Sequence, residues 1–186
     1  MKLKLLVIIE DKFNDVELTS TLSVLKAADV IESITYYAPE ISSATGQFGL
    51  SHVDNIVHQY NLEDYNAIFI PGGKGCQTLR NNPTSLAVIK DFYQANKYLF
   101  AICDAPNVLM EAKILPPYIH YSSYPSQWSL PTRGSNRSDE MTSCDGKIIT
   151  GKNAFAAPEL GLRIIHELFS EELSLRTYIK INGDQY

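Results

Sequence analysis

The stretch Tyr98-Leu99-Phe100-Ala101-Ile102-Cys103-Asp104-Ala105-Pro106 joins a short apolar run to a cysteine and then to helical sequence. The next residues, 107–112, are typical of a helix. A short apolar run between helical segments indicates a buried parallel strand. We therefore expect Cys103 at a sharp turn from a strand to a helix, which is the geometry of a nucleophile elbow.

Such a turn would favour chemistry at the Cys103 sulfur. The N-terminus of a helix stabilises a thiolate, and its free N–H groups can hold an oxyanion. The alternative is a structural cysteine, because cysteine is among the most buried residue types and usually acts as a small hydrophobe. Taken alone, these nine residues favour the structural alternative, so other stretches of the chain decide the question.

The order of the predicted elements indicates one α/β domain over residues 1–186. Of these 186 residues 45% are hydrophobic, which is enough for a compact core. Strands and helices alternate, which predicts a mostly parallel sheet with helices on both faces. The expected strands are residues 3–9, 31–38, 65–70, 98–102, 114–123 and 147–150, with a last one in 173–186. The expected helices are residues 15–28, 83–95 and 107–112, and a long helix from 158.

Three connections also have a predicted form. Residues 41–57 are expected to make a hairpin-like excursion, in which Phe48, Leu50 and Val53 would face water. Residues 125–139 are polar and interrupted by prolines and a glycine, which predicts a loop. Asp145-Gly146 fits a tight turn between two short strands.

Composition excludes several classes of function. The net charge is −5, so no footprint for nucleic acid is visible. No apolar run is long enough to cross a membrane, and the N-terminus lacks a signal-peptide cleavage site, so we expect a cytoplasmic protein without membrane contact. The three cysteines fit neither a disulfide framework nor a zinc pattern, and we expect no metal and no cofactor.

Two other segments are expected to meet Cys103 at the carboxyl ends of the strands. Gly72 and Gly73 follow a buried strand, where glycines let the backbone turn and direct N–H groups at a ligand; a plain tight turn is the alternative. Glu17 lies in the first turn of its helix. It has capping-box spacing from Asn14, but it would also reach the Cys103 sulfur, where a protonated carboxyl can donate a hydrogen bond to a thiolate.

With these residues in view, the chain resembles the ThiJ/PfpI superfamily, the DJ-one-like proteins. The resemblance rests on Phe69-Ile70-Pro71-Gly72-Gly73, on Ala101-Ile102-Cys103-Asp104-Ala105-Pro106, on Glu17, and on Asp145 to Thr150 before a long helix. It covers residues 4–169. It implies a flavodoxin-like, glutamine amidotransferase-like three-layer α/β/α sandwich with a reactive, easily oxidised cysteine, and a homodimer. Members include intracellular proteases or amidases, glyoxalases, proposed deglycases, chaperones and redox sensors.

The chain departs from the family at its histidine. Protease-type members have histidine directly after the nucleophile, where this chain has Asp104. Deglycase-type members take a histidine from the strand after the elbow helix, and Tyr124 aligns there. His120, four residues earlier, would point to the same face of a regular strand, although a structural role is the stronger alternative. The family's Gly-Pro-Gly before the last helix is replaced by Asn153-Ala154-Phe155.

Two functions from different classes follow. In the first, Cys103 attacks a small carbonyl or acyl substrate, Glu17 moves the proton, and the Gly73 and Asp104 amides, with Gly72 beside them, stabilise the oxyanion; Asp104 or Tyr124 replaces the histidine. In the second, a redox or stress protein senses an oxidant through Cys103. Cys76, after the glycine turn, is the competing thiol. A PfpI-type protease is disfavoured because amide hydrolysis needs a proton donor.

Overall fold

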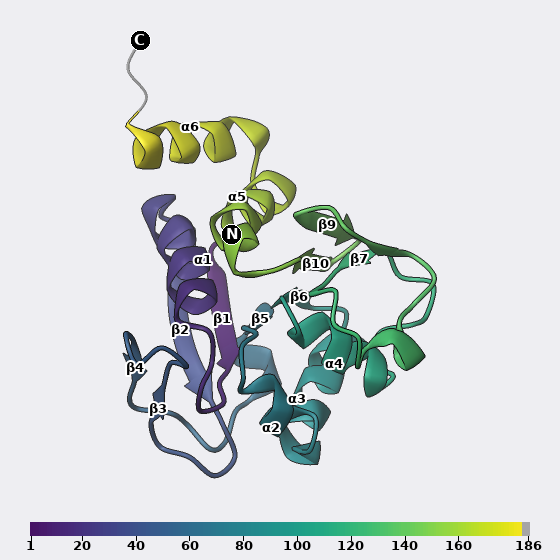
Figure 1. Cartoon of the computed structure of the whole chain (residues 1–186). Helices are drawn as coiled ribbons and strands as arrows, with labels where there is room; N and C mark the ends of the chain where they lie inside the picture. Colours follow the sequence, from purple (N-terminus) through teal and green to yellow (C-terminus); the bar gives the residue numbers. More distant parts are fainter. Residues whose placement is uncertain (184–186) are drawn as a thin grey trace.

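A six-stranded sheet between two layers of helices forms the body of the computed structural model, which describes residues 1–183 (Figure 1). The strands lie in the order β2-β1-β5-β6-β10-β9, and every neighbouring pair is parallel except β10 and β9. Their bounds are β1 Leu3–Ile8, β2 Ile31–Tyr37, β5 Ala67–Ile70, β6 Tyr98–Ile102, β9 Thr142–Asp145 and β10 Ile148–Gly151. The predicted fold class is confirmed.

The helices cover the two faces of this sheet. One layer contains α1 Asp15–Ala27, α5 Ala157–Leu168 and α6 Glu171–Asn182. The other contains α2 Cys76–Leu79, α3 Pro83–Gln94 and α4 Ala105–Glu111. Side chains of β1 alternate between the layers: Leu5 and Val7 pack toward α1 and α5, whereas Leu6 and Ile8 pack toward α3 and α4. None of the helices within residues 1–183 is long and apolar enough to cross a membrane.

Helices α1 and α5 approach each other closely at Gly161. A Cβ atom at this position would lie 2.7 Å from Cβ of Val24, so only glycine permits the contact. Thr21 of α1 also donates a hydrogen bond from Oγ1 to the carbonyl of Ala157, at 3.1 Å. These contacts pack α5, near the end of the chain, directly against α1, near its start.

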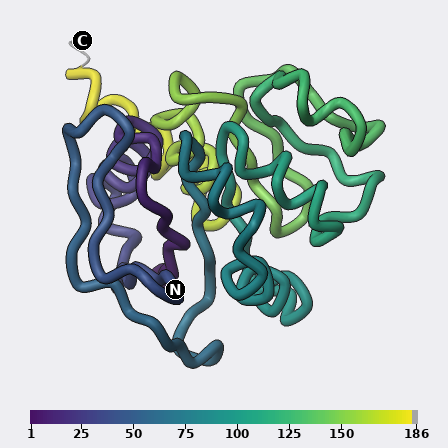
Figure 2. The backbone as a smooth tube through the Cα atoms, turned by 60° about the horizontal axis from the view of Figure 1, so that its bottom comes forward, coloured from purple at the N-terminus to yellow at the C-terminus, as the bar shows by residue number. Residues whose placement is uncertain are grey.

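The excursion between β2 and β5 runs along one side of the molecule, as the blue segment in Figure 2 shows. It contains the antiparallel pair β3 Ala44–Thr45 and β4 His52–Val53, so the predicted hairpin is confirmed. Phe48 and Leu50 are exposed as expected, but Val53 is buried, because it points inward from β4 against the α1 layer. A single 3₁₀ turn, Leu62–Asp64, follows before β5.

The loop inside this hairpin is held by the carboxylate of Asp15, at the start of α1. Asp15 accepts hydrogen bonds of 2.8 to 2.9 Å from the amides of Phe48, Leu50 and Ser51 and from the Ser51 hydroxyl. Burial by itself would raise the pKa of Asp15, but these hydrogen bonds outweigh it and lower the pKa. The anchor is therefore a charged group.

The expected sheet strand over residues 114–123 is wrong. Only Tyr121–Ser122 is extended, as β7, and it pairs with β8 Arg137–Ser138 in a separate two-stranded sheet. Prolines 116 and 117 interrupt the segment, since proline lacks the donor that a ladder needs. The predicted loop over residues 125–139 therefore contains β8, and it also contains a 3₁₀ turn, Leu130–Thr132.

The expected strand at the end of the chain is also wrong, because residues 171–182 form α6. Ser170 caps this helix, its hydroxyl accepting from the Leu173 amide at 3.1 Å, and two glutamates occupy the first turn. Near the other end, Lys180 Nζ donates to the carbonyl of Ala27 at 2.9 Å and ties α6 to α1. The rest of the predicted strand, residues 184–186, lies outside the described residues.

Candidate functional site

Cys103 lies at the carboxyl end of β6, between this strand and α4. Its φ angle of 64° is in the left-handed region, which costs free energy for a residue with a side chain. Two hydrogen bonds hold the turn: the Cys103 amide donates to Gly151 of β10 at 2.9 Å, and the Cys103 carbonyl accepts from the Tyr124 amide at 2.8 Å. The expected elbow is therefore present in the backbone.

Glu17 is fully buried in the first turn of α1. Asn14 caps the helix alone, its Oδ1 accepting from the amides of Val16 at 3.0 Å and Glu17 at 3.2 Å. The Glu17 carboxyl instead reaches across to the turn after β5, where Oε2 accepts from the Gly72 amide at 2.7 Å. Among the described residues Oε1 has no regular hydrogen bond, and the Cys103 thiol lies beside this carboxyl. A capping role in α1 therefore does not explain why the Glu17 carboxyl lies against Gly72 and Cys103.

The carboxyl and the thiol change each other's proton affinity. Burial raises the pKa of Glu17 from about 4.5 to about 7, although the thiol and the Gly72 amide lower it in part. Burial also raises the pKa of the Cys103 thiol, and the charge of Glu17 adds to that increase, whereas the Asp104 amide lowers it. Near neutral pH, Glu17 can therefore either donate or accept a proton next to the sulfur.

The two glycines after β5 have different roles in the site. A Cβ at Gly72 would lie 2.5 Å from Oε2 of Glu17 and 2.6 Å from Cβ of Cys103, so no side chain fits between these groups. Because the Gly72 amide already bonds to Glu17, it is not free for an oxyanion, contrary to its predicted role. Gly73 has a φ of 100°, lines the pocket, and its amide has no acceptor among residues 1–183. The amides of Gly73 and Asp104 remain as the donor pair.

The carboxylate of Asp104 is engaged in an ion pair rather than free for proton transfer. Its Oδ2 lies 2.7 Å from NH1 of Arg80, whose Nε contacts Glu111 at the same distance. Its Oδ1 accepts from Asn107 at 2.9 Å and from the indole N–H of Trp128 at 3.4 Å. Arg80 thus offsets a negative charge that would otherwise oppose a thiolate at the adjacent residue.

A pocket of about 500 Å³ opens above the sulfur. Cys103, Glu17 and Gly73 form part of its lining, together with Asp104 and Tyr124. Polar side chains from the start of α1, the hairpin loop and the glycine turn also line it, as do the aromatic side chains of Trp128 and Phe155. The pocket is open, so Tyr124 and Asp104 do not fill the space next to the thiol.

Comparison with known proteins agrees with this geometry. The model of the DJ-1/PfpI family matches residues 3–167. The chain belongs to the DJ-1/PfpI family. It is 36% identical to the uncharacterized protein MG029 of Mycoplasma genitalium, over 87% of this chain and 86% of that one. It is 26% identical to protein/nucleic acid deglycase 2 of Escherichia coli, over 62% and 67%, and 28% identical to deglycase PH1704 of Pyrococcus horikoshii, over 61% and 68%.

Solved structures of the DJ-1/PfpI fold superpose on nearly the whole chain. The protein VC2308 has a TM-score of 0.84 at 19% identity, covering 97% of this chain and 93% of its own. DJ-1 of Schizosaccharomyces pombe has a TM-score of 0.79 at 19% identity, covering 96% and 98%. At this identity the likeness shows the fold.

Tyr124, the residue expected at the position of the family histidine, lines the pocket and is 43% exposed. His120 does not serve in its place. Because β7 begins at Tyr121, the regular strand that would turn His120 toward the site does not exist; Nε2 of His120 instead lies 3.5 Å from Glu140. None of the four histidines, all within residues 1–183, lines the pocket.

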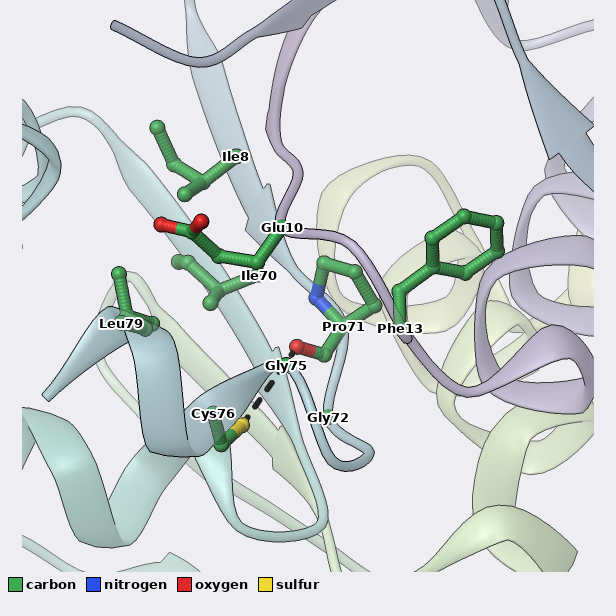
Figure 3. A pocket seen from close by; sticks show the side chains of 9 residues that line it. All are labelled: Ile8, Glu10, Phe13, Ile70, Pro71, Gly72, Gly75, Cys76 and Leu79. Carbon is green, nitrogen blue, oxygen red and sulfur yellow. Dashed lines mark hydrogen bonds between the residues drawn. The ribbon is translucent and has the colours of Figure 1, made fainter. Parts of the chain in front are cut away.

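Cys76 lies beside the site but outside the pocket. It begins α2 directly after the glycine turn, and its Sγ points to the carbonyl of Pro71 at 3.9 Å (Figure 3). Its buried side chain lines a cavity of about 10 Å³ together with Glu10 and Leu79, and burial raises the pKa of its thiol well above the ordinary value. Because Cys76 is buried and does not line the pocket, we expect Cys103 to be the more reactive thiol.

Sequence reasoning missed three residues of the site. Arg80 carries no motif, and only the fold brings it from the end of α2 to Asp104. Trp128 and Phe155 lie in irregular segments whose placement the sequence does not fix. The one available signal was the presence of large aromatic residues in segments that otherwise read as loops.

Proposed function

We propose that this chain is a Cys103-dependent enzyme that acts on small carbonyl compounds, with α-oxoaldehydes as the substrate class. The observation that carries the proposal is the buried Glu17 carboxyl beside the Cys103 thiol, at the base of an open pocket. The names of the deglycase relatives support the class of chemistry.

The geometry supports addition of the sulfur to an aldehyde. The thiol proton passes to Glu17 as the carbon–sulfur bond forms, and the carbonyl oxygen gains negative charge. The Gly73 and Asp104 amides, whose residues line the pocket, would stabilise that oxygen, and Glu17 would then return the proton to it. A carboxyl with a pKa of about 7 suits both directions of transfer at neutral pH.

The remaining steps need no outside oxidant. With methylglyoxal, Glu17 would remove the hydrogen on the former aldehyde carbon as a proton, and the ketone carbon would gain a proton. The former aldehyde carbon is then the carbonyl carbon of a thioester with Cys103. Water then cleaves the carbon–sulfur bond and the thiol regains its proton. The aldehyde carbon is oxidised, the ketone carbon is reduced, and methylglyoxal plus water yields lactate.

Peptide hydrolysis is disfavoured by the same geometry. Amide cleavage requires proton delivery to a basic leaving nitrogen, commonly by histidine. The pocket is lined by no histidine of residues 1–183, and Asp104 is held by Arg80. Loss of acid–base help costs about two to four orders of magnitude in rate, so peptide cleavage should be close to undetectable.

The second candidate is a redox function at the same cysteine. A peroxide would oxidise the Cys103 thiol to a sulfenic acid and be reduced to water or an alcohol, with Glu17 hydrogen-bonded to the product. The missing histidine favours this candidate, whereas the open pocket favours the enzyme. The two functions predict different products from the same residue.

A turnover screen separates these candidates. Purified protein is incubated with methylglyoxal, a small amide and a fluorogenic peptide, beside Cys103→Ala and the matched control Cys144→Ala. We expect consumption of methylglyoxal that is lost in Cys103→Ala and kept in Cys144→Ala. Equal rates in the wild type and Cys103→Ala would overturn the proposal. Stoichiometric oxidation of Cys103 by peroxide without turnover of any substrate would leave the redox function.

A further inference from the structure

The pocket is much larger than a three-carbon substrate needs. Its volume of about 500 Å³ falls in the range of ~300–1,000 Å³ that holds drug-sized ligands. Methylglyoxal would occupy only the part next to Cys103 and leave the outer part to water. The residues that line the outer part therefore indicate what further group of a substrate the pocket could bind.

Three aromatic side chains belong to the lining of this pocket. Tyr124, Trp128 and Phe155 line it, and their side chains are 43%, 58% and 88% exposed. They come from two segments: Tyr124 and Trp128 from the stretch between β7 and the 3₁₀ turn at Leu130, and Phe155 from the turn Ala154–Ala156. Three aromatic rings that converge on one pocket while remaining open to water provide apolar surface for a ligand.

Trp128 is fixed relative to the nucleophile. Its indole N–H points to Asp104, the residue after Cys103, and Asp104 is itself held by Arg80 and Asn107. The segment that carries Trp128 is fixed as well, because Arg133 NH2 donates to the Ser126 carbonyl at 2.9 Å. The indole N–H is thus hydrogen-bonded to the residue that follows the reacting cysteine, and both residues line the same pocket.

We infer that the site takes α-oxoaldehydes that carry a flat aromatic group, and that Trp128 is the residue that selects them. This inference rests on the proposed function for the reaction and on the aromatic lining of the pocket for the selectivity. The aldehyde adds to Cys103 and the ring packs against Trp128. Phenylglyoxal plus water would yield mandelate by the same internal redox change as above.

The binding test uses the fact that Trp128 is the single tryptophan of the chain. Mandelate and lactate share a hydroxy-acid group and differ in a phenyl ring against a methyl group. Titrated into Cys103→Ala protein, mandelate should change the tryptophan fluorescence with a Kd at least tenfold below that of lactate. A tenfold ratio corresponds to about 1.4 kcal/mol. Equal affinities, or no fluorescence change with mandelate, would overturn the inference.

The kinetic test compares two variants of Trp128. We expect Trp128→Ala to lower the ratio of kcat/KM for phenylglyoxal to that for methylglyoxal about tenfold, and Trp128→Phe to retain most of it. Leu130→Ala is the matched control, since Leu130 is exposed in the same segment but does not line the pocket. Because phenylglyoxal also modifies arginine, initial rates are corrected with Cys103→Ala protein.

The outcomes separate this inference from the proposed function. Mandelate binding without turnover of either aldehyde would refute the proposed function and leave the aromatic selectivity. Turnover with an unchanged ratio in Trp128→Ala would refute the selectivity alone. A change of molar mass in Trp128→Ala, with the ratio unchanged, would assign the aromatic surface to an interface between chains and overturn the inference.

Discussion

At the scale of single residues, Glu17 links the chemistry of the site to the stability of the fold. Its pKa is about 4.5 in an unfolded chain and about 7 in the folded one. Between these values the folded state holds a proton that the unfolded state has lost. The free energy of unfolding therefore falls as the pH rises from about 4.5 to 7, by up to about 3 kcal/mol from this group.

Glu17→Gln should remove that part of the pH dependence. Glutamine stays neutral and can still accept the hydrogen bond of the Gly72 amide. Urea unfolding at pH 5 and pH 7 should show a smaller difference in the variant than in the wild type, and Glu172→Gln, on the exposed surface of α6, should behave as the wild type. An unchanged difference in Glu17→Gln would contradict the raised pKa.

Breaking the ion pair of Arg80 and Asp104 should lower the free energy of unfolding strongly. Arg80→Met leaves the carboxylate of Asp104 buried without its cation, and we expect a loss of about 3–5 kcal/mol in the free energy of unfolding. Adding Asp104→Asn should restore part of that loss, since no buried charge then remains. Glu111→Gln, the more exposed partner of the same arginine, should cost less. A double variant as unstable as Arg80→Met would refute this account.

The sequence predicted the residues whose role follows from a local pattern. Cys103 stands at a strand-to-helix junction, and Glu17 stands in a helical first turn, so both positions were predictable. The hydrogen bond of Glu17 to Gly72 and the engagement of Asp104 by Arg80 depend on which strands become neighbours in space. Nothing in the local sequence states that Arg80 points to Asp104, and so the sequence left the role of Asp104 open.

At the scale of elements, one carboxylate orders the loop between β3 and β4. Asp15→Ala removes the acceptor of four hydrogen bonds, and we expect a loss of about 2–3 kcal/mol. The amides of Phe48, Leu50 and Ser51 should then exchange faster with solvent. Because the pKa of Asp15 is lowered, its contribution is present above the ordinary pKa of an aspartate and is lost as the pH falls below it.

Asp11→Ala is the control for this loop, since Asp11 accepts a single hydrogen bond there, from the Thr45 amide. Asp11→Ala should lower the free energy of unfolding less than Asp15→Ala does, and it should leave the exchange of the Phe48 and Leu50 amides unchanged. Equal exchange profiles for the two variants would show that the loop is held by its packing and not by Asp15.

Buried strands and long helices were predictable, because their apolar residues follow a clear period. The two errors fall where that signal is weak. Residues 114–123 contain apolar side chains that pack on the core from outside the six-stranded sheet, as Tyr121 of β7 does. Residues 171–182 alternate enough to suggest a strand, but the Ser170 cap and the glutamates after it were the better signal for a helix.

At the scale of the whole molecule, we expect the chain to associate as a homodimer. Phe48 and Leu50, on the hairpin excursion, are 60% and 84% exposed and would lose contact with water in an interface. Light scattering at micromolar concentration should give twice the chain mass, and the double variant Phe48→Ser/Leu50→Ser should shift it toward the monomer. Leu175→Ser, an exposed position on α6, is the control. A monomeric wild type would refute the expectation.

The close contact of α1 with α5 at Gly161 also has a consequence for synthesis of the chain. A ribosome delivers α1 more than a hundred residues before α5, so β1 and β5 emerge with the part of their apolar face that α5 later covers still open to solvent. Until residues 157–165 arrive, that part stays exposed to chaperones, proteases and other nascent chains. Completion of the core therefore waits for the last helices, and a polypeptide truncated before α5 would become a substrate for quality control rather than a folded protein.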